Sequence, residues 1–275
     1  MIYHFTKIFF IIMLFYDFFL INNDIKYMNS IEELEKLFSR DLSNGSYYLD
    51  PENTDDINEL IMLDVSCNRI PMIDNSIGNL TNLTQLCIDE NEIEIIPESI
   101  GNLVNLTHLM INDNKISMLP ESIGSLVNLK FLNMNNNCLT ELPESIGCLI
   151  NLIELDISDN CLTELPESIG CLINLSTLSI YGNKLDILPE SIYKLSNLVE
   201  LLVSNCNLSE LSKSIFKLTN LLYLDISHNN FYILPEIPLS IDDVLIHHNP
   251  VYNCRKNILD IQYLIHFMKM NEMNN

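Results

Sequence analysis

Leu106-Thr-His-Leu109-Met-Ile111-Asn-Asp-Asn114-Lys-Ile116 decides the fold of this 275-residue chain, because its lettering recurs along most of the sequence. Aligned copies read L-x-x-L-x-L-x-x-N-x-L, with the asparagine at positions 68, 91, 114, 137, 160 and 183, a constant spacing of 23 residues. Cys206 replaces the next asparagine, and the register continues to Asn229 and, after a shorter step of 20 residues, to Asn249. We therefore count nine repeats, and a fixed period of this length predicts a solenoid of stacked identical units.

Each part of the repeat has a physical role. The last two leucines of L-x-x-L-x-L alternate with other residues, so they lie on one face of a short strand. Stacking the strands in parallel buries these leucines and pairs the strand backbones. The asparagine amide both donates and accepts, so it can satisfy backbone groups in the turn. Leu119-Pro120-Glu121-Ser122-Ile123 and its copies predict a return on the outer side through a short helical turn.

The full pattern, L-P-E-S-I-G-x-L-x-N-L-x-x-L-x-L-x-x-N-x-L, resembles the 23-residue intracellular class of leucine-rich repeats, which includes Ras-binding scaffold proteins, Scribble-like polarity proteins and plant Ras-group repeat proteins. The resemblance covers about residues 57–252. It implies an α/β solenoid, curved as a horseshoe, with a parallel sheet on the concave side, helical turns on the convex side and helical caps. The Ile- and Asn-rich, Trp-free lettering is also similar to that of repeat proteins from AT-rich genomes, such as those of giant viruses and amoebae.

Four segments follow from this pattern. Residues 1–27 are an apolar N-terminal segment, 28–56 an N-terminal helical cap and linker, 57–252 the solenoid, and 253–275 a C-terminal helical cap. The first cap opens with Ser30-Ile-Glu-Glu33, a capping box, and continues into a polar linker over 41–56. At the other end Pro250 is expected to end the last turn. Helical spacing then relates Ile258, Ile261, Ile265 and Met268.

The apolar segment 1–27 is compatible with several roles. Residues 8–21 are almost entirely apolar, which suits a signal or a membrane anchor. The run is shorter than the roughly 20 residues that span a bilayer, and no small-residue cleavage pattern follows it. An upstream extension before a start at Met28, or a buried segment, explains it as well. Sequons such as Asn105-Leu-Thr107 arise mostly from the repeat's own lettering.

The cysteines are expected to be reduced packing residues. Four of the eight are copies within a sixteen-letter block, NCLTELPESIGCLINL, that occurs at both 137–152 and 160–175 and indicates an internal duplication. A disulfide between Cys138 and Cys161, or between Cys148 and Cys171, is the alternative, because equivalent residues of adjacent repeats lie roughly 5 Å apart.

The concave face is the expected binding surface. Its variable positions include ten acidic residues and no Lys or Arg, with three large aromatic residues between them. Aromatic anchors and carboxylates suit a basic protein or peptide, although a chain with a formal charge of −23 shows acids on any exposed face. The predicted protein-binding residues are Asp89, Glu90, Asp113, Phe131, Glu154, Asp156, Asp159, Tyr181, Glu200, Tyr223 and Asp225.

Charge and motifs exclude other classes of function. Only 14 Lys and Arg oppose 37 Asp and Glu, which argues against a nucleic-acid partner. There is no Gly-rich phosphate loop, G-x-S-x-G or H-E-x-x-H motif, so neither catalysis nor a cofactor is expected. His228, His247 and His248, with Asp225 and Asp243, fall on adjacent strands at one end of the concave face. A metal site is conceivable there, but exposed histidines usually bind nothing, and no metal is expected.

Two functional hypotheses remain. The favoured one is a cytoplasmic, monomeric scaffold that binds another protein, which the resemblance suggests is often a small GTPase or a signalling enzyme. The other is a membrane-associated or secreted recognition module, targeted through residues 1–27.

Overall fold

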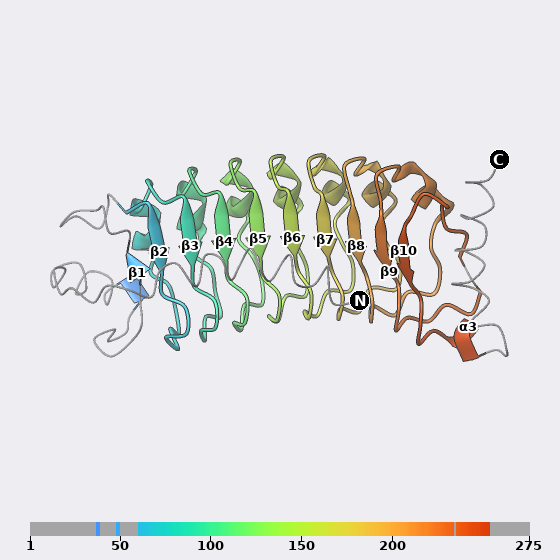
Figure 1. Ribbon diagram of the computed structural model, residues 1–275. Coiled ribbons are helices and arrows are strands. Elements are labelled where there is room, and N and C mark those ends of the chain that lie inside the picture. The colour runs from blue at the N-terminus through green and yellow to red at the C-terminus, as the bar shows by residue number, and fades with distance from the viewer. Residues whose placement is uncertain (1–36, 39–47, 50–59, 234, 254–275) are drawn as a thin grey trace.

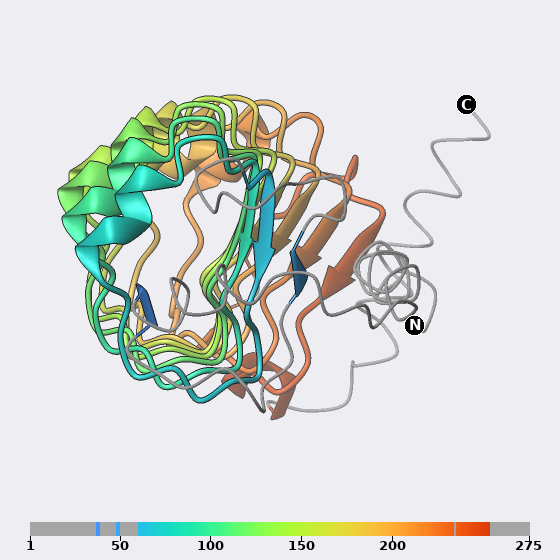
Figure 2. The same cartoon turned by 90° about the vertical axis from the view of Figure 1, so that its left-hand side faces the viewer.

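In the computed structural model, residues 37–38, 48–49, 60–233 and 235–253 are described. They form an elongated coil in which each turn contributes one strand to a single sheet (Figure 1). Viewed along the coil, the strands lie on one side and the short helices on the opposite side, with the leucine core between them (Figure 2). This arrangement confirms the predicted α/β leucine-rich repeat solenoid.

Nine parallel strands, one for each predicted repeat, form the body of the sheet in the order of the sequence. Most neighbours pair with a register shift of 23 residues, and the last pair differs by 20. The strands are β2 (Met62–Asp64), β3 (Gln85–Cys87), β4 (His108–Met110), β5 (Phe131–Asn133), β6 (Glu154–Asp156), β7 (Thr177–Ser179), β8 (Glu200–Leu202), β9 (Tyr223–Asp225) and β10 (Asp243–Leu245).

The predicted helical turns on the outer side are 3-10 helices. Pro97, Pro120 and their equivalents stand immediately before most of them with φ near the value that proline fixes, whereas Asp74 and Ser212 cap the first and last with their side chains. The helices are η2 (Asn75–Asn79), η3 (Glu98–Asn102), η4 (Glu121–Ser125), η5 (Glu144–Cys148), η6 (Glu167–Cys171), η7 (Glu190–Lys194) and η8 (Lys213–Lys217).

The sheet is open and shows little of the curvature that a horseshoe implies (Figure 1). Curvature of a solenoid comes from a difference in width between its two sides. A 3-10 helix is slimmer than an α-helix, so here both sides advance by similar distances per repeat. The surface predicted as concave is therefore nearly flat, and we call it the sheet face.

A glycine in each of helices η2 to η6 lets neighbouring repeats approach closely. A Cβ atom added at Gly147 would lie 2.6 Å from the carbonyl oxygen of Ser168 in the next helix, well inside van der Waals contact. This close approach ends at η7, where Tyr193 takes the glycine position and is buried. The interface between η7 and η8 is thus built differently from the five before it.

The ladder asparagines, which are the repeated asparagines of the signature, connect each repeat to the one before it. The Asn160 amide oxygen accepts from the backbone N–H of Leu139, 2.9 Å away. Its amide nitrogen donates to the carbonyl oxygens of Met134 at 3.0 Å and of Ser158 at 3.0 Å. Cys206 keeps only the donor role, since its thiol lies 3.2 Å from the carbonyl oxygen of Ile180 but offers no amide oxygen.

The two ends differ in part from the prediction. The segment 41–56, predicted as a linker, contains β1 (Tyr48–Leu49), which pairs antiparallel with β2 and covers its free edge. Leu37 and Phe38 are helical and buried in the core. Pro250 begins the short helix α3 (Pro250–Asn253) instead of ending a turn, because a proline needs no N–H partner in a first helical turn. The remaining cap residues and 1–27 lie outside the described part.

The described cysteines form no disulfide, and their burial corrects the prediction that they are packing residues. Cys206 is fully buried, but Cys138, Cys148 and Cys171 are exposed. In the sixteen-letter block three of the four cysteines are exposed and Cys161 is half-buried, so duplication, and not core packing, accounts for them.

The ladder predicts a sharp difference between two asparagines of one repeat. Asn160→Ala removes the inter-repeat hydrogen bonds and leaves buried backbone groups unpaired, so we expect a loss of about 3 kcal/mol in the free energy of unfolding. Asn151→Ala removes one exposed bond, 2.8 Å from the amide nitrogen to the Val127 carbonyl oxygen, and should cost less than about 1 kcal/mol. Urea unfolding followed by circular dichroism measures both, and equal losses would contradict the role of the ladder.

Candidate functional site

The sheet face presents side chains in columns that cross the strands. The strand register places equivalent positions of successive repeats side by side, about 4.8 Å apart. Every predicted binding residue lies in one of these columns. The first column, which starts each strand, contains Met62, Gln85, His108, Phe131, Glu154, Thr177, Glu200, Tyr223 and Asp243.

The middle of this first column brings together four of the predicted residues. Phe131, Glu154, Thr177, Glu200 and Tyr223 follow one another on β5 to β9, and all five are half-buried. Two carboxylates therefore flank one small residue, and an aromatic ring lies beyond each carboxylate. The spacing of strands separates the two carboxylate positions by roughly 10 Å. We call these five residues the central column.

The aromatic side of this arrangement extends one strand further. The His108 ring stacks on Phe131, with 4.6 Å between ring centroids and 17° between ring planes. Partial burial, followed by the charge of Lys130, lowers the pKa of His108. The neutral ring and Phe131 together give an apolar platform beside Glu154.

Among the described residues, no Lys or Arg forms an ion pair with a carboxylate of the central column. Burial raises the pKa of Glu154, and the negative charges of Asp156 and Glu200 raise it further. Lys115 pairs instead with Glu92 at 3.1 Å, and Lys213 with Glu236 at 3.2 Å, and none of these four residues belongs to the central column. A cation placed over the central column would relieve the mutual repulsion of these acids.

Two of the predicted binding acids have a structural role as well. The Asp156 carboxylate accepts from the backbone N–H of Ser158 at 3.0 Å and also from its hydroxyl. Asp225 makes the same pair of bonds to Ser227, at 2.9 and 2.6 Å. These are local turns of the D-x-S type, and their lettering was visible in the sequence. One oxygen of each carboxylate is thus occupied in holding the turn.

A fourth column follows the strands and has a backbone conformation that sequence reasoning missed. In all nine repeats the residue before the ladder asparagine, or before Cys206 in its place, has positive φ, for example 51° at Glu90, 54° at Asp113 and 48° at Asp159. The signal was the frequency of Asn, Asp and Gly at this position, since these residues tolerate left-handed backbone best. The column is Cys67, Glu90, Asp113, Asn136, Asp159, Gly182, Asn205, His228 and His248.

Hydrogen bonds order several residues near this column. The Asp113 carboxylate accepts from the Asn112 and Asn136 side-chain amides. Burial raises the pKa of Tyr181, and the negative charges of Asp156 and Asp159 add to this effect, as does the hydrogen bond between Tyr181 and Asp159. Asp113, Asp159 and Tyr181 are therefore held by neighbours on the face, and their predicted binding role stays a prediction.

Asp89 is the most perturbed carboxyl of the sheet face. Burial raises its pKa to about 7, helped by the charges of Asp64, Glu90 and Asp113. It lies toward the N-terminal end of the face, two strands away from the central column. Ionisation of Asp89 near neutral pH therefore destabilises the fold.

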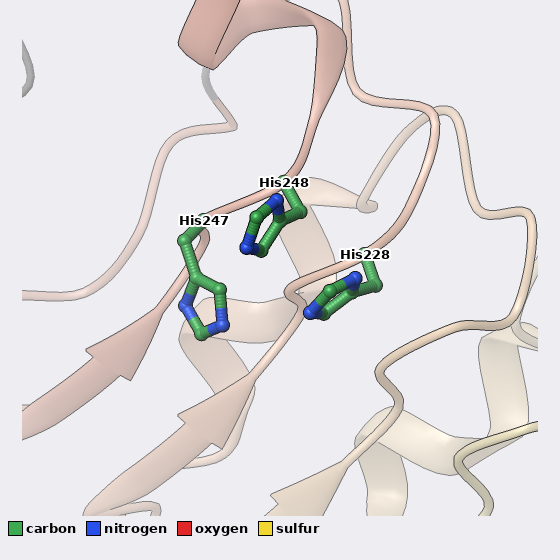
Figure 3. Close-up of side chains that lie close together, drawn as sticks. All are labelled: His228, His247 and His248. Atoms are coloured by element: carbon green, nitrogen blue, oxygen red, sulfur yellow. The ribbon is translucent and has the colours of Figure 1, made fainter.

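The three histidines singled out in the sequence do come together. His228, His247 and His248 form a cluster beyond the ends of β9 and β10 (Figure 3). Asp225 and Asp243, which were grouped with them, are not members of this cluster. Among the described residues it is the one group whose arrangement suits a metal ion.

Asp89→Asn should stabilise the fold at pH 8. Because the pKa of Asp89 is higher in the folded chain than in the unfolded chain, the folded chain binds this proton more tightly. The contribution of the protonated carboxyl to the free energy of unfolding is therefore fully present below about pH 4 and is lost as the pH rises toward 7. We expect the variant to gain about 1 to 2 kcal/mol at pH 8 and nothing at pH 4, allowing for partial exposure. Urea unfolding at both pH values measures this, with Glu121→Gln, an exposed acid of helix η4 that does not act on Asp89, as the control. A gain that does not depend on pH would contradict the explanation.

Comparison with known proteins agrees with this geometry. Two protein-family models match the chain. The family described as "Leucine-rich repeat region" matches residues 63–160 and 115–187, and the family described as "Leucine Rich Repeat" matches residues 220–242. No curated protein matches the chain. None of the helices in the described part has the length and apolar character needed to cross a membrane.

The chain is similar to several solved structures. The PEPR1-AtPEP1 structure is 32% identical over 65% of this chain, with a TM-score of 0.59, and a TDR receptor is 26% identical over 69%, with a TM-score of 0.62. A leucine-rich repeat protein of Leptospira interrogans, LIC12759, is 29% identical over 66%, with a TM-score of 0.42. The matches span 26%, 35% and 59% of those chains.

The repeat period, the ladder asparagines, the parallel sheet and the matched family models agree, and the chain belongs to the leucine-rich repeat family.

Proposed function

We propose that this protein is a non-enzymatic interaction scaffold that binds a partner protein on the sheet face, with the central column as the centre of the contact. The observation that supports this most is the spatial order of side chains across strands β5 to β9: an aromatic residue, an acid, a small residue, an acid and an aromatic residue. Large half-buried aromatic residues near the middle of a surface are typical anchors of protein interfaces. Leucine-rich repeat domains are typically interaction scaffolds, which is consistent with this reading.

The proposed partner presents a basic group to the central column. Thr177 leaves room between Glu154 and Glu200, and no Lys or Arg in the described part of the chain forms an ion pair with either carboxylate. A Lys or Arg side chain over Thr177 would contact both acids, while Phe131 and Tyr223 would pack on its flanks. A basic surface on a small GTPase or a signalling enzyme, as the 23-residue class suggests, would meet this requirement.

A second candidate is a membrane-associated or secreted recognition module. The similarity to the TDR receptor supports it, as do the apolar residues 8–21. The sequons are weaker support for secretion, because their asparagines also make structural hydrogen bonds. The side-chain amide of Asn105 donates to the Thr81 carbonyl oxygen at 2.9 Å, and that of Asn174 to the Ile150 carbonyl oxygen at 2.8 Å.

The central column is tested with charge-neutral, isosteric changes. Glu154→Gln with Glu200→Gln should lose the partner in affinity capture, because two charge-assisted contacts disappear. The matched control is Glu121→Gln with Glu144→Gln, which removes the same charge from exposed positions of η4 and η5. The full chain, the variant and the control are used as baits, and the captured protein is then titrated against each.

We expect the control to bind like the original chain and the variant to bind about 10-fold to 100-fold more weakly. Binding of the original chain should also weaken with added salt. Equal affinity for all three baits would place the contact away from the central column. Sedimentation of the full chain with membranes, or a mobility shift on glycosidase treatment, would favour the recognition module instead.

A further inference from the structure

The histidine cluster, His228, His247 and His248, lies at the C-terminal end of the sheet face and has no role in the proposed partner contact. It is built by the same register as the sheet. The backbone N–H of His228 donates to the carbonyl oxygen of His247 at 2.9 Å, which continues the pairing of β9 and β10 past the strand ends. The backbone therefore fixes which histidines become neighbours.

Two of the histidines occupy equivalent positions of adjacent repeats. His228 precedes Asn229 and His248 precedes Asn249, and both have left-handed backbone, with φ of 55° and 56°. The ladder asparagines hold this conformation: the Asn249 amide oxygen accepts from the Phe231 N–H at 3.1 Å, and its nitrogen donates to the Ile226 carbonyl oxygen at 2.9 Å. The Cα positions are thus set by buried bonds, while the side chains are exposed or half-buried.

The rings lie close enough for shared coordination. His228 and His248 stack with 4.3 Å between ring centroids, and His247 lies 5.2 Å from the first and 5.1 Å from the second (Figure 3). One nitrogen from each ring can be chosen so that all three lie within 4.8 Å of one another. Tetrahedral zinc with nitrogen ligands at 2.0–2.1 Å separates those nitrogens by about 3.3 Å. Rotation of solvent-facing side chains is sufficient to close the remaining distance.

We propose that His228, His247 and His248 together bind one divalent transition-metal ion, with Zn²⁺ as the representative, through one imidazole nitrogen each. The all-imidazole set selects zinc, copper or nickel over calcium and magnesium, which prefer oxygen ligands. Three protein ligands leave a coordination position open toward solvent on the sheet face. The ion would thus be accessible to water or to a ligand group of another molecule.

The test uses the purified full-length chain, stripped with a chelator and titrated with Zn²⁺ against a chromophoric indicator. We expect one equivalent to bind, and His228→Ala, His247→Ala and His248→Ala each to weaken binding more than 100-fold, beyond the 10-fold to 100-fold that changes around a metal's ligands cost. His108→Ala is the matched control, since this histidine stacks on Phe131 and lies outside the cluster. It should leave zinc binding unchanged.

The cysteines need their own control, because thiols also bind zinc. Cys138→Ser with Cys161→Ser should retain the zinc equivalent, and the Co²⁺-loaded chain should show no thiolate charge-transfer absorption. Circular dichroism of each variant checks that it is folded. Failure of the original chain to bind Zn²⁺, binding that survives His247→Ala in a folded variant, or loss of binding in the cysteine control would each overturn the proposal.

Discussion

The hydrogen bonds of the ladder asparagines are the constraint on which the rest of the structure depends. From Asn91 onward, each amide accepts from the repeat before it and donates both to that repeat and to its own turn, as Asn114 does with Ile93, Ile88 and Ile111. A buried amide with every bond made has one rotamer and one distance to its neighbours. The ladder therefore fixes the register of the strands, and through it the columns of the sheet face.

The sequence predicted what is periodic and missed what depends on the ends or on local backbone. Nine repeats, the parallel sheet and the helical returns follow from leucine and asparagine spacing, which has one physical solution. The strand Tyr48–Leu49 was missed because its pairing is long-range and its lettering is polar around it. The flatness of the sheet was also missed, because curvature depends on the width of the returns, and the letters Pro-Glu-Ser-Ile-Gly do not distinguish a 3-10 from an α-helical turn.

The candidate site was predictable as a surface but not as a set of roles. Alternation along a strand determines which side chains point outward, and it placed strand residues such as Glu154 and Tyr223 on the sheet face. Selected residues that follow the strands, such as Glu90, continue its columns through left-handed backbone. Their roles depend on neighbours that the sequence does not reveal. Asp156 holds its own turn, Asp89 is crowded by other acids, and Phe131 stacks on a histidine from the preceding strand. The sequence identified the three histidines near the end of the sheet, but it also grouped Asp225 and Asp243 with them. The three-dimensional structure shows that these two acids do not belong to the cluster.

The glycine of the outer helices has a consequence for how this chain can change in length. From η2 to η6 each helix meets the next through the same glycine-to-serine contact, so these interfaces are interchangeable. A whole repeat can be gained or lost among them without creating a new kind of junction, and the sixteen identical letters at 137–152 and 160–175 are what a recent gain would leave. Tyr193 ends the interchangeable series. Growth of the array is thereby confined to the repeats before η7, while the end that holds the histidines keeps its own geometry.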